Sequence, residues 1–112
     1  MRKIEMFIRP EQLEDVKRAL LARGVHGLSL TEVKGFGRQG GHKEVYRGKE
    51  LWVEFLPKLK LETVVKAEDV DSIVDAVCAA AGTGQVGDGK IFIHPVIGAT
   101  RIRTRESGPE AL

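Results

Sequence analysis

The sequence lacks the features that mark secreted or membrane-spanning proteins. It has one cysteine, Cys78, so no disulfide can form within the chain, as is typical of a reducing compartment. It has no apolar run near the ~20 residues that cross a bilayer, and no long apolar leader at its start. The formal net charge is only +2, which is weak support for a polyanionic partner. We therefore expect a cytoplasmic protein.

Catalytic and metal-binding patterns are absent from the sequence too. The three histidines are scattered without the spacing of a zinc site. Cys78 lies among alanines, which favours a small buried side chain over a nucleophile. Glu62 and Asp88 lack the paired spacing that acid–base catalysis would need. These absences favour a binding protein over an enzyme.

What is present is a clear hydrophobic periodicity. Alternation and β-branched content predict four strands, at residues 3–9, 28–36, 59–66 and 91–96. Apolar residues at helical spacing predict two helices, at residues 11–23 and 70–81. Pro10 and Gly24 suit the two ends of the first helix, and residues 101–103 are expected to be extended. The order predicts one α+β domain of the split βαβ (βαββαβ), or ferredoxin-like, type.

The sheet of such a domain has one face covered by the helices and one face that needs another cover. We expect apolar side chains on this second face that should not be exposed to water. They are Ile4, Leu59, Leu61, Val65 and Ile93. A chain this short also buries only part of its apolar surface. Both points indicate that subunits associate.

A long loop is predicted over residues 37–54, where all periodicity is lost among glycines and charged residues. Loops of this length in small domains are usually functional or mobile. Trp52, within it, is either a binding hot spot or packs on its own domain. The charged residues nearby are either partner contacts or a solvated face.

Three glycine motifs fail as standard nucleotide signatures. The G-x-G-x-x-G at residues 35–40 is not followed by a helix, and the one at 82–87 follows a helix. The G-x-x-x-x-G-K at residues 84–90 continues with Ile91, where a P-loop needs Ser or Thr. Glycine-rich turns can nevertheless aim backbone N–H groups at an anion. Lys90 follows the second of these turns, and Arg101 and Arg103 should lie on one side of an extended segment. The glycine-rich turn and these three cations form either a clamp for a polyphosphate or a flexible turn beside a solvated basic edge.

Several segments together resemble the PII nitrogen-regulatory family over the whole chain. They are TEVKGFGRQ at residues 31–39, YRG at 46–48, FLPK at 55–58, TG at 83–84, VGDGKIF at 86–92 and RIRT at 101–104. In the family's terms they belong to a T-loop at about 37–55, a B-loop at about 82–90 and a C-loop at about 101–112. The resemblance implies a homotrimer of ferredoxin-like subunits. It also implies ATP or ADP, with Mg²⁺, in the clefts between them, and 2-oxoglutarate as an effector.

The resemblance also assigns site residues. It implies nucleotide contacts from Ser29, Gly35, Gly37, Arg38, Gln39, Glu62, Val64, Gly87, Asp88, Gly89, Lys90, Arg101, Ile102 and Arg103, with the arginines reaching across the cleft. It implies 2-oxoglutarate contacts from Gln39, Gly41 and Lys58. Gln39 would also help to ligate Mg²⁺.

The T-loop would be the switch in this interpretation, since ligands at its base would shift its populated shapes. The resemblance implies an ammonium transporter or a nitrogen-metabolism enzyme or regulator as partner, so that a membrane is met only through a partner channel. The expected contacts are Tyr46, Arg47, Lys49, Leu51 and Trp52. Leu51 and Lys49 occupy the slots of the family's modified Tyr and Ser, so neither modification is expected there. Gly40, Ser29 and Arg105 also depart from the family's usual residues.

Other functions stay open on the residues alone. The chain could be a PII-like sensor of another metabolite or a slow ATPase that lacks a catalytic base and a P-loop hydroxyl. A nucleic-acid module that stacks bases on Phe7 and Phe92 is a third class. No basic and aromatic signature surrounds those two residues, so we expect no nucleic-acid partner.

Overall fold

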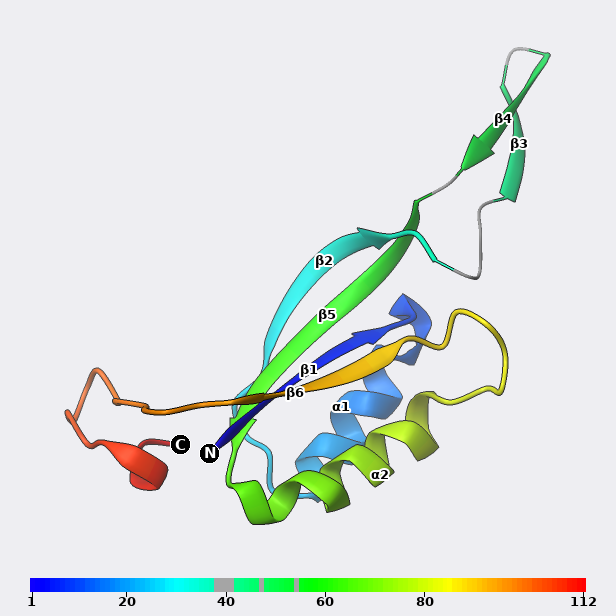
Figure 1. Ribbon diagram of the computed structural model, residues 1–112. Helices are drawn as coiled ribbons and strands as arrows, with labels where there is room; N and C mark the ends of the chain where they lie inside the picture. The colour runs from blue at the N-terminus through cyan, green and yellow to red at the C-terminus, as the bar shows by residue number, and fades with distance from the viewer. Residues whose placement is uncertain (38–41, 47, 54) are drawn as a thin grey trace.

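The computed structural model describes residues 1–37, 42–46, 48–53 and 55–112, and for 42–46 and 49–53 it describes the backbone only. A four-stranded sheet forms the body of the molecule, from β1 (Arg2–Ile8), β2 (Ser29–Gly35), β5 (Leu56–Val65) and β6 (Lys90–Pro95). Its order is β2-β5-β1-β6, and all neighbouring strands are antiparallel. Two helices, α1 (Leu13–Ala22) and α2 (Val70–Ala81), lie side by side on one face (Figure 1). The predicted βαββαβ fold is confirmed.

The core lies between this sheet and the two helices. Alternate residues of β1 and β5 point to the helices, and an apolar stripe on each helix, with the 3.6-residue period of a helix, packs against them. The largest fully buried side chains are Ile4, Met6, Ile8, Val16, Leu20, Leu61, Ile73 and Val77. Short 3-10 turns lead into both helices, η1 (Pro10–Gln12) and η2 (Ala67–Asp69).

The apolar residues from which we inferred subunit association lie on the wrong face for that inference. Ile4, Leu59, Leu61 and Val65 are buried beneath the helices, and only Ile93 is exposed, at 43%. Strand side chains alternate between faces, and periodicity alone does not say which face the helices cover. The expectation that these side chains make the open face apolar was therefore wrong.

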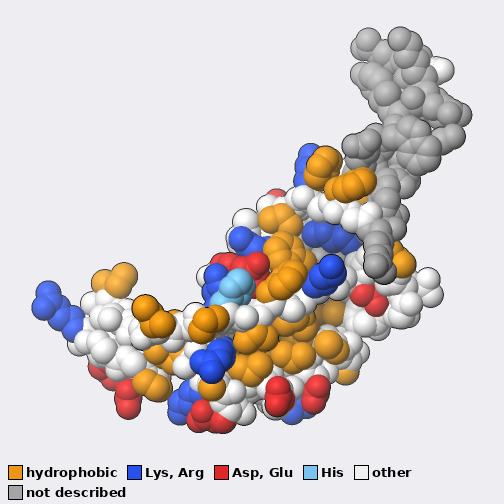
Figure 2. All heavy atoms as spheres, viewed as in Figure 1, with side chains coloured by type: hydrophobic (Ala, Val, Ile, Leu, Met, Phe, Trp, Pro, Cys, Tyr) orange, Lys and Arg blue, Asp and Glu red, His pale blue; other side chains and the backbone are white. Residues whose placement is uncertain are grey.

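The open face, which we define as the sheet face away from the helices, carries charged side chains instead. Lys3 Nζ lies 3.7 Å from Glu62 Oε1, and Lys60 Nζ lies 3.8 Å from the same oxygen. Phe7 and Phe92 form an edge-to-face pair on this face, with ring centroids 6.1 Å apart. In Figure 2 hydrophobic side chains gather between β6 and the helices, below the charged part of the sheet.

The long loop contains a hairpin that the sequence did not reveal. Strands β3 (His42–Tyr46) and β4 (Lys49–Val53) pair antiparallel and are joined by two residues, of which Gly48 has φ +77°. Positive φ suits the tight turns that join hairpin strands. The prediction of an unstructured segment over residues 37–54 was wrong for these ten residues. Figure 1 shows the hairpin beyond the ends of β2 and β5.

The segment after β6 also differs from the prediction. Residues 102–104 form a turn, closed by a hydrogen bond of 2.8 Å from the Arg105 N–H to the Arg101 carbonyl. Arg105 has φ +62°, a conformation that non-glycine residues seldom adopt. The expectation of an extended Arg101–Ile102–Arg103 segment was wrong, because this turn reverses the chain. A last 3-10 turn, η3 (Gly108–Ala111), follows.

Candidate functional site

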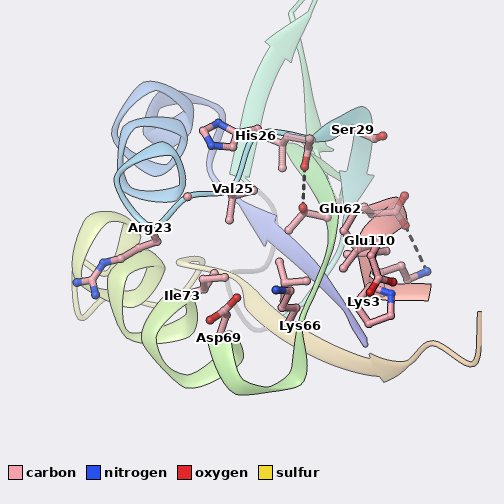
Figure 3. Close-up of a pocket in the computed structure, with 18 residues that line it drawn as sticks. Lys3, Arg23, Val25, His26, Ser29, Glu62, Lys66, Asp69, Ile73 and Glu110 are labelled. Atoms are coloured by element: carbon pink, nitrogen blue, oxygen red, sulfur yellow. Dashed lines mark hydrogen bonds and ion pairs between the residues drawn. The ribbon is translucent and has the colours of Figure 1, made fainter. Parts of the chain in front are cut away.

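Two hollows lie at opposite ends of β2 and β5. The first, of about 710 Å³, is bounded by the end of β2, the start of β5 and residues 85–90, and we name it the loop hollow. The second, of about 790 Å³, lies where β2 begins and β5 ends, and the C-terminal residues Pro109, Glu110 and Leu112 close it. We name it the tail hollow (Figure 3). Both have the size of small-molecule sites.

A carboxylate folded inward shapes the glycine-rich segment 82–90 beside the loop hollow. One Asp88 oxygen, Oδ2, accepts hydrogen bonds from the Thr83 N–H at 2.7 Å and the Gly84 N–H at 3.0 Å. The Thr83 hydroxyl donates to the other oxygen, and Arg9 approaches it at 3.5 Å. The hydrogen bond from the Thr83 hydroxyl, followed by the one from its N–H, lowers the Asp88 pKa from 3.8 to about 2. Asp88 therefore holds the loop closed.

The low pKa of Asp88 predicts that the stability of the folded protein depends on pH. A depressed pKa in the folded state contributes stability that is nearly complete above about pH 4.5 and is lost as the pH falls toward 2. The expected result is an Asp88 carboxyl signal that titrates near pH 2 by NMR. The melting temperature of the unaltered protein should exceed that of Asp88→Asn by a constant margin above about pH 4.5 and converge on it below. A midpoint near the ordinary 3.8 would contradict the loop-holding role.

Lys58 and Arg9 tie the same loop to the sheet. Lys58 Nζ, on β5, donates to the Gly87 carbonyl at 2.7 Å, and Arg9 Nη2, directly after β1, donates to the Val86 carbonyl at 2.9 Å. Burial, and secondly the nearby Arg9 charge, lower the Lys58 pKa. Sequence reasoning missed Arg9 and Thr83. Arg9 gave no signal because its contact with Asp88 spans 79 residues, whereas Thr83 lies only five residues from Asp88.

Backbone geometry restricts two positions of the loop to glycine. Gly87 and Gly89 both have φ +104°, a region that L side chains rarely adopt. A Cβ on Gly89 would lie 1.7 Å from the Phe7 carbonyl oxygen of β1. The loop thus passes directly against β1, and it brings backbone N–H groups and Lys90 to the rim of the loop hollow.

The predicted site residues are divided between the two hollows. The loop hollow contains Gly35, Gly37, Lys58, Gly87, Asp88, Gly89 and Lys90. The tail hollow contains Ser29, Glu62 and Val64. Ser29 and Gly35 stand at opposite ends of β2, which at about 3.3 Å per residue places them ~20 Å apart. A single chain therefore does not bring the predicted nucleotide residues together.

The remaining predicted residues fall into two groups. Some line neither of the two hollows, and for the others the structure describes the backbone alone or nothing. The turn at residues 102–104 places Arg101 and Arg103 off any strand face, and Ile102 is 96% exposed. Arg101 Nη1 pairs with Glu106 Oε1 at 2.9 Å. The predictions at Arg38, Gln39, Gly41 and Arg47 lie outside the described residues. For Tyr46, Lys49, Leu51 and Trp52 the structure describes the backbone alone, in β3 and β4.

The described part of the chain contains neither a cluster of metal ligands nor a membrane-spanning helix. In that part of the chain, no three His, Cys, Asp or Glu side chains gather in a way that could hold a metal ion. No helix among the described residues has the length and apolar content to cross a membrane.

Comparison with known proteins identifies the class to which this fold and loop arrangement belong. The family model for "Nitrogen regulatory protein P-II" matches residues 1–106. Proteins of the same name from Cereibacter sphaeroides, Rhizobium etli and Haemophilus influenzae are 55%, 54% and 52% identical over 112 residues, which cover 100% of both chains. The class is that of small regulatory proteins that transmit a signal and are not enzymes.

The chain belongs to the nitrogen regulatory P-II family. The resemblance, the regulatory role and the βαββαβ fold expected from the sequence are confirmed.

Proposed function

We propose that this P-II protein acts in the cytoplasm as a homotrimer that binds ATP or ADP in the clefts between its subunits. With Mg-ATP bound it senses 2-oxoglutarate, and the T-loop, residues 37–55, passes the result to an ammonium transporter or a nitrogen-metabolism enzyme or regulator. The observation that supports this proposal best is the division of the predicted nucleotide residues between two hollows.

The two hollows offer complementary halves of a nucleotide site. The loop hollow supplies three lysines, Lys34, Lys58 and Lys90, and a glycine loop, which suit phosphates. The tail hollow supplies the Ser29 hydroxyl, the Glu62 carboxylate and the Val64 side chain, which suit a ribose and a base. In a closed cyclic assembly each subunit presents one patch to the opposite patch of its neighbour. Such an assembly joins the loop hollow of one subunit to the tail hollow of the next.

The cations of the loop hollow fit a nucleotide that carries Mg²⁺. When bound, Mg²⁺ neutralises part of the phosphate charge and prefers oxygen ligands. Gln39 would add such an oxygen from the base of the T-loop. Lys90 and the N–H groups of the glycine loop would bind the phosphates, and Arg101 and Arg103 of the neighbouring subunit would approach from across the cleft.

Lys58 is placed to join the effector to the loop. Its ammonium lies 2.7 Å from the neutral carbonyl of Gly87. A carboxylate of 2-oxoglutarate, held also by Gln39 and Gly41, would offer this ammonium a charged acceptor, which is the stronger hydrogen-bond partner. Effector binding would then alter a contact that fixes the glycine loop, and so shift the populations of the T-loop. The T-loop would contact partners through Tyr46, Arg47, Lys49, Leu51 and Trp52.

Calorimetry of the purified oligomer tests this function. We expect saturable binding of ATP and ADP, and 2-oxoglutarate binding that is much tighter when Mg-ATP is present. Lys58→Met should weaken 2-oxoglutarate binding by tenfold or more, because a charge-assisted hydrogen bond contributes roughly 1.5–3 kcal/mol.

Lys60→Met is the matched control, since Lys60 lies on the same strand and face two residues further along. It should leave 2-oxoglutarate binding unchanged. An affinity for 2-oxoglutarate that is the same with and without ATP would argue against the proposed linkage.

A further inference from the structure

Arg101, one of the residues proposed to bind phosphate, is already bound by the end of its own chain. Its Nη1 donates to Glu106 Oε1 at 2.9 Å. Its Nη2 donates to the main-chain oxygens of Glu110 at 3.2 Å and Leu112 at 3.3 Å. One side-chain carboxylate and two main-chain oxygens thus occupy both terminal nitrogens of a guanidinium fork that suits the oxygens of a phosphate.

The backbone holds residues 106–112, which we name the tail, in this position. The Arg101 N–H donates to the Glu106 carbonyl at 2.9 Å, and the Gly108 N–H donates to the Ala99 carbonyl at 3.0 Å. Thr100 and Ser107 pair as an isolated β-bridge. The tail is therefore folded back on residues 99–101 and does not extend away from them.

The same tail covers the other part of the proposed nucleotide site. Pro109, Glu110 and Leu112 line the tail hollow together with Glu62 and Val64. Figure 3 shows Glu110 on the side of the hollow where Lys3, Glu62 and Ser29 lie. One short segment thus binds the phosphate-binding arginine and closes the hollow proposed for the ribose and base.

We propose that the tail is an intramolecular competitor of the nucleotide, which must displace it from Arg101 and from the tail hollow in order to bind. This inference rests on the proposed nucleotide function. The Arg101–Glu106 pair is partly exposed, with 35% and 46% of the two side chains accessible, so the competition is modest. It sets the affinity for nucleotide and does not prevent binding.

Glu106→Gln tests the competition, because it keeps the shape of the side chain and removes the charge that holds Arg101. Calorimetry of the full-length oligomer should show ATP binding about two- to fivefold tighter than in the unaltered protein. Glu14→Gln is the matched control, since it removes the same charge from an exposed carboxylate on α1 whose ion pair is with Lys17, three residues along the same helix. It should leave the affinity unchanged.

Hydrogen exchange gives a second readout that does not depend on the variants. Saturating ATP should speed the exchange of amides in residues 106–112, including the Gly108 amide that bonds to Ala99. Unchanged or weaker ATP binding by Glu106→Gln, an equal gain in both variants, or slower exchange of the tail with ATP would each overturn the competition. Loss of saturable binding in the unaltered protein would instead overturn the proposed function, and this inference with it.

Discussion

Replacement of Gly89 by alanine is expected to abolish tight nucleotide binding while the subunit stays folded. The new Cβ would lie 1.7 Å from the Phe7 carbonyl oxygen, and φ of +104° is unfavourable for any L side chain. β1 is held in place, because it is one of the two inner strands of the sheet and pairs with β5 on one side and β6 on the other. The glycine loop must therefore leave its place and take Lys90 and its N–H groups with it.

The expected loss is large because several contacts fail together. A hydrogen bond to a charged group contributes about 1.5–3 kcal/mol, so the loss of two weakens ATP binding by about a hundredfold or more. Calorimetry measures the affinity, and circular dichroism with size-exclusion chromatography shows whether the fold and assembly survive.

Two further alanines separate the causes. In Gly98→Ala the new Cβ has open space around it and φ is ordinary, so this variant should bind ATP normally. In Gly84→Ala the new Cβ also has open space, but φ is +81°, so this variant has backbone strain without a steric clash. Gly84→Ala should show a small loss of ATP affinity. Normal ATP affinity in Gly89→Ala would refute the proposed role of the loop.

Much of the fold could be read from the sequence because local patterns determine it. The alternation of Ile4, Met6 and Ile8 predicts a half-buried strand, and Gly24, with φ +80°, ends the first helix as expected. The strand predicted at residues 59–66 begins earlier, at Leu56. A proline inside a strand is tolerated where the strand has a neighbour on one side, and Pro57 pairs with Lys34 of β2, whereas the pairing of β5 with β1 begins at Leu59.

The failures share a physical cause, which is that non-local contacts decide the outcome. Whether Leu61 faces the helices or the open face depends on the packing of the whole sheet. The turn after Arg101 requires a positive φ at Arg105, and no local rule predicts such a φ for arginine. The hairpin of β3 and β4 turns at Gly48 without the Asn-Gly or Asp-Gly pair that usually marks such turns.

The candidate site shows the same division. The glycine loop and Lys90 were found from composition, because phosphate chemistry needs those residue types. That Asp88 turns inward to Thr83, and that Arg9 binds the loop across 79 residues, follows only from the fold. The separation of Ser29, Glu62 and Val64 from the glycine loop also needed the structure, since it depends on which end of each strand they occupy.

Mixed oligomers are expected to regain a nucleotide site that neither parent has. Lys90→Ala damages the loop hollow, and Glu62→Ala damages the tail hollow. If every site combines Lys90 of one subunit with Glu62 of the next, each parental homotrimer has three damaged sites. A trimer that contains both kinds of subunit has about one whole site, whichever kind is in excess. The reason is that only one of its three junctions joins a subunit with an intact Lys90 to a next subunit with an intact Glu62.

The experiment is co-expression of the two variants with different affinity tags and tandem purification of the mixed oligomers. A matched control pairs Lys90→Ala with a subunit that carries both substitutions, a mixture in which no whole site can form. Each parent alone should bind ATP at least about tenfold more weakly than the unaltered protein, since a contact to a charged group is lost.

Calorimetric titration of the purified mixed oligomer with ATP is the most direct test of a site shared between subunits. The account predicts about one nucleotide per trimer at the unaltered affinity, with none at that affinity in the parents or in the control mixture. A mixed oligomer that binds no better than its parents would show that both hollows serve a nucleotide within one chain, or serve none, and would contradict the account.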